Sequence, residues 1–464
     1  MGTASKSFAL VLVALFLTSL VKVSSALSTQ ATPTWNTQLV DPKGAGGSIA
    51  IDSQGNPHIV YYYSYIVNDS SASQMKYAVW TGTNWTIQTI DPSGSWGSLA
   101  LDSKDDPHVL YNVGNSLKYA VLNDNSWNIQ TVDSSVSRGT SMALDSNGNP
   151  HVAYFTSKYP ENYVNDSVTQ TQDLNYAVWN GSNWTHQIID RVNVFVGVGS
   201  PSIVLDTNNY PHILYDENVV FEYYNQYEWN NLSFYSTDNI KYASWTGNSW
   251  QIQNVVSNST GKGNLVLDSN QRPSFCYIDV NFSYSPSPNS NSFKETHSPN
   301  YIYWNGHGWL SRAINTKPSW SGQTYLKLDS NDDPQIFFYS KNYQNASASG
   351  LFLEHWTGSN WNTQNLGDFP LENSRYYQGT ENIADTVFDS HGRLSLTYDG
   401  EVGTIRGAPI DGDLTYATID VTGISFAPNS LLLLTLILVI IFLAVSLLLY
   451  RRHRKTIFQN KPNV

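Results

Sequence analysis

Apolar residues form two continuous segments near the ends of the chain, and between them they alternate with polar residues over short runs. Residues 75–91, for example, alternate with a period of two, which is the period of a half-buried β-strand. Gly, Pro, Asn and Asp separate these runs, as turns between strands require. The pattern therefore predicts a large all-β domain with many short strands.

The two apolar segments predict export and a membrane anchor. Residues 1–26 contain the basic Lys6, then an apolar stretch and a small-residue cleavage site, which is typical of a signal peptide. An uncleaved N-terminal anchor is the alternative. Residues 430–450 carry no charge and are long enough to cross a bilayer, and the basic tail at 451–464 is expected to stay cytoplasmic. We therefore expect a single-pass protein of the cell membrane, with an extracytoplasmic N-terminal domain and a linker at 421–429.

A motif of the form Asp-Ser-x-Gly-x-Pro-His recurs through the middle of the chain and defines its organisation. Residues 48–61 are the first copy and predict strand, turn and strand. Residues 75–91 show the second half of the unit, in which two strands flank a Trp-x-Gly-x-x-Trp hairpin. A repeated four-stranded unit of about 40–45 residues is typical of a β-propeller blade. The Asp of the turn occurs seven times, at Asp52, Asp102, Asp145, Asp206, Asp268, Asp329 and Asp389.

The seventh unit has only three predicted strands before the chain reaches the linker. Residues 34–41 match residues 84–91, the fourth strand of the first unit. We expect this N-terminal strand to complete the seventh blade, because closure removes an exposed sheet edge. The predicted fold is thus an all-β, seven-bladed β-propeller over residues 33–420, closed by the N-terminal strand, plus one C-terminal transmembrane α-helix.

The blade motifs resemble those of seven-bladed β-propeller repeat proteins of prokaryotic cell surfaces. The resemblance covers residues 33–420 and rests on Asp-Ser-x-Gly-x-Pro-His and Tyr-Ala-x-Trp-x-Gly-x-x-Trp. It is only loosely similar to sialidase-type propellers, because their Ser-x-Asp-x-Gly-x-Thr-Trp order is absent. Cys276 is the single cysteine, and an exported domain without disulfides fits a prokaryotic surface, with an archaeal one as an option.

Three repeated features are interpreted as structural. The Trp pairs at spacing five are expected to face each other across a hairpin, with sugar stacking as the alternative. The Asp-containing turns lack the terminal Glu of a calcium loop, so they are interpreted as Asp-capped turns. One repeat position carries a histidine in four blades, and each of these histidines is expected to form hydrogen bonds within its blade. They are His58, His108, His151 and His212. No metal site and no cofactor are predicted.

The charge distribution narrows the choice of partners. Seven of the 25 basic residues lie in residues 1–26 and 451–464, which hold no acid, so residues 27–450 carry 37 acids against 18 bases, a formal charge of −19. This excess argues against nucleic acid and anionic lipid as partners. It is compatible with cations and neutral polymers.

Insertions are predicted on one face of the ring only. The loops between the second and third strands share this face with the loops between blades, and we call it the elaborate face; the short hairpins form the plain face, expected to lie toward the membrane. Loops held by a rigid scaffold commonly carry function. Candidate ligand-binding residues on the elaborate face are aromatic or cationic, although the aromatic ones could instead pack the loops onto the ring: Tyr223, Tyr224, Tyr227, Trp229, Tyr235, Trp96, Trp320, Arg138, Arg191 and Arg375.

The chain also contains nine Asn-x-Ser/Thr patterns, which agree with an extracytoplasmic glycoprotein. Those selected as glycosylation candidates are Asn68, Asn165, Asn231, Asn258, Asn281 and Asn345.

Three functions remain open from the sequence. The leading hypothesis is a cell-surface binding or adhesion protein that recognises extracellular glycan or protein through the elaborate face, and it predicts no catalytic residue. A sialidase-like hydrolase or lyase acting on polysaccharide is the second, and it requires Arg138, Arg191 and Arg375 to converge. A structural component of the envelope is the third.

Overall fold

The computed structural model describes the repeat region with gaps at several loops. Within it no helix is long and apolar enough to cross a membrane. The predicted signal peptide, linker, transmembrane segment and cytoplasmic tail lie outside the described residues, apart from Val421. The described residues are 34–67, 70–158, 170–194, 199–223, 233–285, 292–314, 324–340, 350–366, 383–389, 393–399, 403–405, 408–410 and 413–421.

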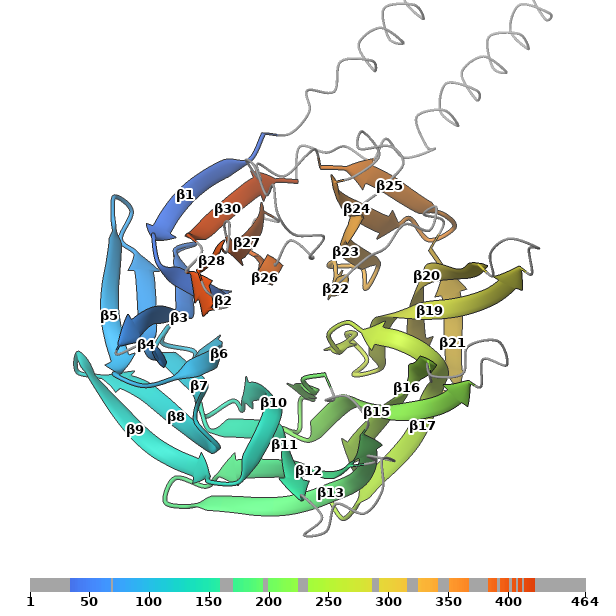
Figure 1. Ribbon diagram of the computed structural model, residues 1–464, viewed down its shortest axis with the longest axis horizontal. Helices are drawn as coiled ribbons and strands as arrows, with labels where there is room; N and C mark the ends of the chain where they lie inside the picture. Colours follow the sequence, from blue (N-terminus) through green and yellow to red (C-terminus); the bar gives the residue numbers. More distant parts are fainter. Residues whose placement is uncertain are drawn as a thin grey trace, which may run out of the picture. The chain divides into compact units, whose positions relative to one another are not determined.

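Seven blades of four antiparallel strands are arranged around a common centre, which confirms the predicted seven-bladed propeller (Figure 1). The first strand of each blade lies nearest the centre and the fourth lies outermost. The first three blades are β2 (Gly44–Ile51), β3 (Pro57–Val67), β4 (Ser70–Trp80) and β5 (Trp85–Asp91); β6 (Ser95–Leu101), β7 (Pro107–Val113), β8 (Ser116–Asn123) and β9 (Ser126–Asp133); and β10 (Val136–Leu144), β11 (Pro150–Lys158), β12 (Gln170–Trp179) and β13 (Trp184–Val194).

Blades four and five form one continuous sheet, because the end of β17 pairs with β19 through Ser259↔Asp279 and Lys262↔Tyr277. The outer strand of one blade thus runs directly into the start of the next. These blades and the sixth consist of β14 (Ser202–Leu205), β15 (Pro211–Tyr223), β16 (Ser233–Trp245) and β17 (Trp250–Lys262); β18 (Val266–Leu267), β19 (Pro273–Ser285), β20 (Ser292–Trp304) and β21 (Trp309–Ala313); and β22 (Thr324–Leu328), β23 (Pro334–Ser340), β24 (Gly350–Trp356) and β25 (Trp361–Asn365).

The seventh blade combines strands from both ends of the repeat region. Its order is β26 (Ile383–Phe388), β27 (Arg393–Asp399), β30 (Leu414–Asp420) and β1 (Asn36–Asp41), and β1 pairs with β30 from Asn36↔Thr418 to Asp41↔Leu414. A separate two-stranded hairpin, β28 (Gly403–Ile405) and β29 (Ala408–Ile410), precedes β30. The N-terminal strand β1 therefore lies beside β30, the third strand of the seventh unit, which is the position predicted for residues 34–41.

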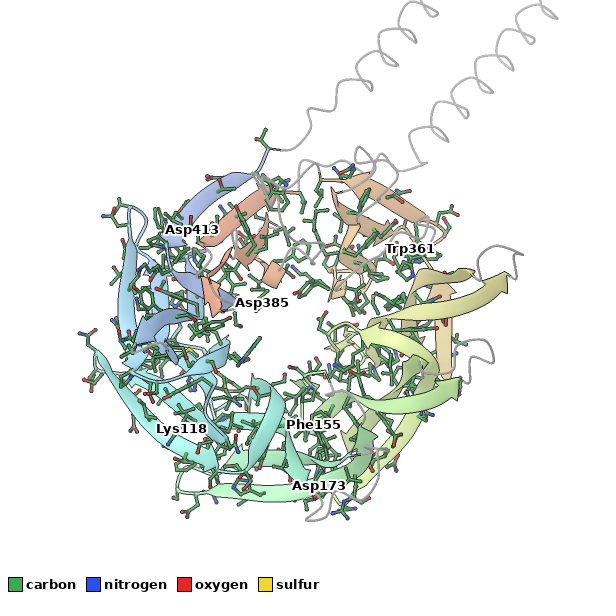
Figure 2. The ribbon with its side chains drawn as sticks, in the orientation of Figure 1. Lys118, Phe155, Asp173, Trp361, Asp385 and Asp413 are labelled. Atoms are coloured by element: carbon green, nitrogen blue, oxygen red, sulfur yellow. The ribbon has the colours of Figure 1, made fainter. Side chains whose placement is uncertain are left out.

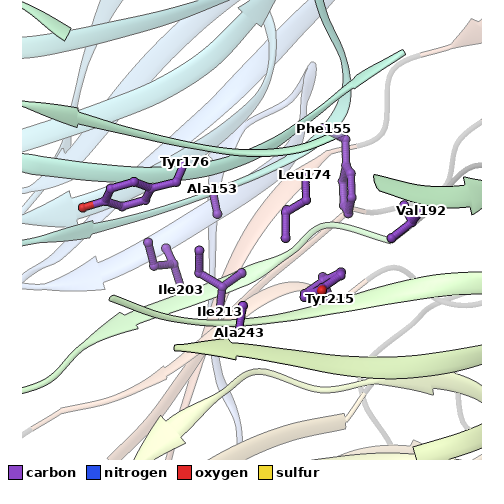
Figure 3. Close-up of a cluster of buried hydrophobic side chains, with 9 residues drawn as sticks. All are labelled: Ala153, Phe155, Leu174, Tyr176, Val192, Ile203, Ile213, Tyr215 and Ala243. Atoms are coloured by element: carbon purple, nitrogen blue, oxygen red, sulfur yellow. The ribbon is translucent and has the colours of Figure 1, made fainter. Parts of the chain in front are cut away.

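Buried side chains fill the junctions between neighbouring blades. Figure 3 shows the junction of blades three and four, where Phe155 and Tyr215 are fully buried among aliphatic side chains from both sheets. Burial of such side chains stabilises by about 1.5–3 kcal/mol each. Each blade therefore obtains its core from its neighbours, as expected for a propeller.

Two kinds of hydrogen bond repeat around the ring and cross from blade to blade. On the outside, an indole Nε1 donates to a glutamine Oε1 of the preceding blade, as from Trp127 to Gln88 at 3.1 Å and from Trp250 to Gln187 at 2.9 Å. On the inner strands, the Ser48 hydroxyl accepts the Leu99 N–H at 3.2 Å. Asp385 occupies the serine position in blade seven, and Figure 2 shows it near the centre of the ring. Its Oδ2 accepts the Ile49 N–H at 3.0 Å, which ties blade seven to blade one.

The structure confirms the structural interpretation of the repeated residues. Trp80 and Trp85 face each other with ring centroids 5.4 Å apart, and four further Trp pairs do the same. His58 shares a hydrogen bond with the Tyr77 hydroxyl at 2.5 Å, and the other three histidines have the equivalent tyrosine. Asp145 Oδ1 accepts the backbone N–H groups of Asn147 and Asn149, as an Asp-capped turn requires.

Candidate functional site

The hairpins of the elaborate face differ in length from blade to blade. The β7–β8 hairpin of blade two closes at Val113↔Ser116, whereas the β3–β4 hairpin of blade one continues to Val67↔Ser70. Counted from the repeated histidine, the second strand of blade one (β3) is four residues longer than the second strand of blade two (β7). At about 3.3 Å per residue, its hairpin extends about 13 Å farther. The hairpin of blade two therefore ends lower on the elaborate face than that of blade one, and we call its end, at Val113–Ser116, the low edge.

Trp96 lies at this low edge and is the most exposed of the large apolar side chains described, with 71% of its surface accessible. Its φ is +54°, in a region that bulky residues rarely adopt. The position is a β-bulge between Ser95 and Ser98, and the equivalent bulges of blades one and three contain Gly46 and Gly139, also at positive φ. The bulge geometry favours glycine, yet blade two places a tryptophan there.

Aromatic side chains of blade one lie next to Trp96. The ring centroids of Tyr62 and Trp96 are 6.0 Å apart at an angle of 43°, and we call this pair the aromatic junction. Farther along β3, Tyr63 and Tyr65 lie 6.1 Å apart, and Lys76 Nζ is 3.8 Å from the centre of the Tyr63 ring. All three tyrosines are partly exposed, but Tyr63 and Tyr65 lie on the other face of the blade-one sheet from Tyr62, because side chains alternate along a strand, so the ring beside Trp96 is that of Tyr62.

The equivalent position between blades four and five holds a buried ion pair. Asp216 occupies the repeat position of Tyr62, and Lys262 that of Trp96; their Oδ2 and Nζ atoms are 3.8 Å apart, and we call the pair the charged junction. Lys262 Nζ also donates to the Ser200 carbonyl at 2.5 Å. Asp216 Oδ1 has no hydrogen-bond partner within the described structure. Burial raises the pKa of Asp216, and the nearby ammonium of Lys262 only partly offsets this.

Two further cations on the elaborate face of blades three and four are paired with carboxylates. Arg191 binds the buried Asp173 with two hydrogen bonds, of 2.6 and 3.2 Å. Lys241 Nζ lies 3.1 Å from both Asp190 Oδ2 and Glu217 Oε2, and these two carboxylates raise its pKa. Figure 2 places Asp173 on blade three. Each of these cations has at least one carboxylate partner, so the cluster offers little net positive charge to an anionic ligand.

The structure places only some of the predicted site residues. Trp96 is exposed on the elaborate face, as expected, and Arg191 is more than half exposed but paired with Asp173. Tyr223, Tyr235 and Arg138 lie in strands β15, β16 and β10, and their side chains are outside the description, as are those of the glycosylation candidates Asn258 and Asn281. Outside the described residues altogether lie Tyr224, Tyr227, Trp229, Trp320, Arg375, Asn68, Asn165, Asn231 and Asn345. The predicted convergence of the three arginines therefore stays a prediction.

Sequence reasoning missed Tyr62 and the Asp216–Lys262 pair. A signal for all three was present, because Tyr62 and Asp216 both stand four residues after the repeated histidine. Trp96 and Lys262 both stand six residues before the repeated aspartate. Aligning the blades at these two positions would have shown where neighbouring blades meet on the elaborate face.

Within the described part of the chain, no three His, Cys, Asp or Glu side chains are grouped so that they could hold a metal ion. The described residues offer an open aromatic surface at the junction of blades one and two and paired charges on blades three to five.

Comparison with known proteins finds no matching family model and no matching curated protein. Solved structures with a similar fold include an α-L-arabinanase of Penicillium chrysogenum complexed with arabinobiose, 11% identical over 70% of this chain and 93% of that chain, with a TM-score of 0.41. The polysaccharide lyase Uly1 is 10% identical over 84% of this chain and 92% of that chain, with a TM-score of 0.45. The α-L-arabinofuranosidase of Fusarium graminearum with arabinobiose is 9% identical over 84% and 98%, with a TM-score of 0.42.

Proposed function

We propose that this chain is a membrane-anchored cell-surface protein that binds an extracellular glycan through the elaborate face of its propeller. The observation that carries the proposal is Trp96, a tryptophan 71% exposed in a backbone conformation suited to glycine. Residues held at unfavourable dihedrals cost about 1–3 kcal/mol and cluster at ligand-binding sites. A large exposed aromatic residue is also more informative than scattered exposed aliphatic ones.

The chemistry of the aromatic junction fits a sugar better than a metal or a nucleotide. An indole ring offers a flat, weakly polar surface on which the C–H face of a pyranose can lie, while hydroxyl groups of the sugar stay hydrated. Tyr62, beside Trp96, adds a second ring with a hydroxyl at its edge. Sites of this composition combine apolar contact area with a few polar groups that fix orientation.

Three further parts of the proposal rest on the sequence and on strand pairing. The apolar residues 430–450, followed by the basic tail, support a single membrane anchor. The signal-like residues 1–26 support export. The pairing of β1 with β30, together with the Asp385 bond to blade one, supports closure of the ring by the N-terminal strand. A closed ring is a rigid platform on which the elaborate face would point away from the membrane.

The decisive experiment is binding of the full-length chain in detergent micelles to a glycan array, for the unaltered chain and for Trp96→Ala. We expect the substitution to lower the affinity for bound glycans about tenfold or more, since it removes the main stacking surface. Tyr210→Ala is the matched control, because Tyr210 is a partly exposed aromatic residue at the opposite, plain face. Equal binding by the unaltered chain and Trp96→Ala would contradict the proposal.

A hydrolase or lyase acting on polysaccharide is the second candidate, favoured by one observation. Asp216 is buried, its pKa is raised by burial, and its Oδ1 has no hydrogen-bond partner in the described structure. Carboxyl groups in such surroundings are candidates for general acids. Incubating the polysaccharides that bind and measuring released chain ends, with Asp216→Asn as the comparison, separates this candidate from pure binding.

A further inference from the structure

We propose that the aromatic junction binds internal segments of a glycan polymer, with the chain lying across the low edge of blade two, and not the end of a glycan held in a closed pocket. The inference rests on the proposed function and specifies its ligand. Its basis is the difference in hairpin length on either side of Trp96.

Blade two is lower than both of its neighbours on the elaborate face. Its hairpin ends in the two-residue turn Gly114–Asn115, where Gly114 has a φ of +58°. Counted from the repeated histidine, β3 of blade one extends four residues beyond the end of β7, and β11 of blade three extends two residues beyond it. At about 3.3 Å per residue the neighbouring strands extend about 13 Å and about 7 Å farther.

Trp96 lies directly beside this low hairpin. Its neighbour Ser95 is paired with Asn112, the residue before the last of β7, so the tryptophan stands at the same height as the end of the hairpin. Nothing in the β7–β8 hairpin continues above it, which explains why the ring is 71% exposed although it begins an inner strand. A ligand stacked on Trp96 can therefore continue outward over blade two.

The polar groups at the low edge suit a ligand that passes over them. Asn112 Oδ1 is buried and has no hydrogen-bond partner within the described structure, although it lies in the strand pair that positions Trp96. An acceptor of this kind costs about 1–3 kcal/mol when it is left unsatisfied. Asn112 stands at the repeat position of Tyr62, four residues after the repeated histidine, so it lies on the side of blade two that faces blade three, across the low edge from Trp96.

The charges indicate that the polymer is neutral. Residues 27–450 carry a formal charge of −19, and this field disfavours a long polyanion. Lys76, whose Nζ lies over the Tyr63 ring, is held 3.1 Å from Asp41 Oδ2. A polymer with a carboxylate or sulfate on each unit would gain little from an ammonium that is already paired.

The test raises the low edge without touching Trp96. Gly114–Asn115 is replaced by residues 64–73, the upper part of the blade-one hairpin, with Asn68 changed to Gln so that no glycosylation pattern is added. The probes are soluble xylan, mannan and mixed-linkage β-glucan, each with its di- to hexasaccharides, and the protein is the full-length chain in detergent micelles. The control carries the same ten residues in the plain-face hairpin of blade three, in place of Gly181–Ser182.

We expect the raised edge to lower the affinity for the polymers about tenfold or more, and to change the affinity for di- and trisaccharides less than about threefold. The control should bind both as the unaltered chain does. Unchanged polymer binding, or an equal loss for polymers and short oligosaccharides, would overturn the inference while leaving the Trp96→Ala result intact. If none of these polymers binds the unaltered chain although the glycan array finds a ligand that depends on Trp96, the inference fails and the proposed function stands.

Discussion

The junction of blades one and two and that of blades four and five use the same two repeat positions for opposite purposes. Between blades one and two, Tyr62 and Trp96 form an aromatic surface that is open to solvent. Between blades four and five, Asp216 and Lys262 form an ion pair whose side chains are only 6% and 7% exposed. The backbone differs as well, because Trp96 lies in a bulge of β6 at a positive φ, whereas Lys262 lies where blades four and five form one continuous sheet.

The comparison shows which contacts of the propeller are interchangeable and which are not. The bonds from Trp Nε1 to Gln and from backbone N–H to the inner-strand Ser recur at several junctions, so they hold neighbouring blades together there. The pair at the elaborate-face end of each junction varies in size, charge and exposure. A position that varies within a uniform frame is where a repeat protein can acquire a binding function without loss of its fold.

The largest effect on stability is expected when only one partner of the charged junction is replaced by an apolar residue. Lys262→Met leaves Asp216 buried without its cation, which should lower the free energy of unfolding by about 3–5 kcal/mol at neutral pH. The double variant Asp216→Leu/Lys262→Met should recover most of this loss, because both charges are gone. Denaturant unfolding of the two variants measures the difference, with Lys43→Met, at an exposed lysine, as the control. Equal stability of Lys262→Met and the unaltered chain would show that the pair is not buried as described.

An intermediate effect is expected from a buried carboxyl that forms no ion pair within the described part of the chain. Glu354 in blade six is fully buried, occupies the repeat position of Ala78, and accepts a hydrogen bond from Thr363 while its Oε2 has no partner in the described structure. Burial raises the pKa of Glu354 to about 7. The folded state thus holds this proton more tightly than the unfolded chain, so stability is fully present below pH 4.5 and falls as the pH rises toward 7.

Glu354→Gln should remove this pH dependence. Above pH 7 the variant should be more stable than the unaltered chain by about 2 kcal/mol, and below pH 4.5 the two should be alike. Thermal unfolding across pH 4–9 measures this. A difference that does not change with pH would mean that the substitution acts through packing and not through ionisation.

The fold could be predicted from the sequence because the blade motif occurs seven times along the chain. The Trp pairs, the Asp-capped turns and the match between residues 34–41 and 84–91 each required only local patterns, and the structure agrees with each of them. Trp96 was selected as a candidate because it is an aromatic residue in a predicted loop between blades on the elaborate face. The contact between Asp216 and Lys262 was not predicted, because it joins residues on different blades and Lys occurs only once at its repeat position.

The exposure of Trp96 also could not be derived from its own sequence neighbourhood. It depends on the length of the β7–β8 hairpin and on the bulge at Ser95–Ser98, two features of different strands. The glycines at the equivalent bulges, Gly46 and Gly139, were the available signal of a positive φ. The remaining candidates on the long loops, such as Tyr227 and Trp229, stay predictions.

The smallest effect on stability is expected from substitutions that depend on the backbone conformation at Trp96. At most strand positions Gly is less stable than Ala by about 0.5–1 kcal/mol, because Gly loses more conformational freedom on folding. At position 96 the order should be reversed, with Trp96→Gly more stable than Trp96→Ala by about 1 kcal/mol, because only Gly adopts a φ near +54° without strain. The same two substitutions at Thr86, an exposed position of β5, should show the ordinary order.

Both Trp96 variants should lose glycan binding equally, since both lack the ring, so stability and binding separate at this residue. That separation is what distinguishes a tryptophan retained for a ligand from one retained for packing. If Trp96→Ala proves more stable than Trp96→Gly in thermal unfolding, the bulge relaxes when the ring is removed. The backbone would then impose no cost on Trp96, and the argument from its unfavourable conformation to a binding function would lose its support.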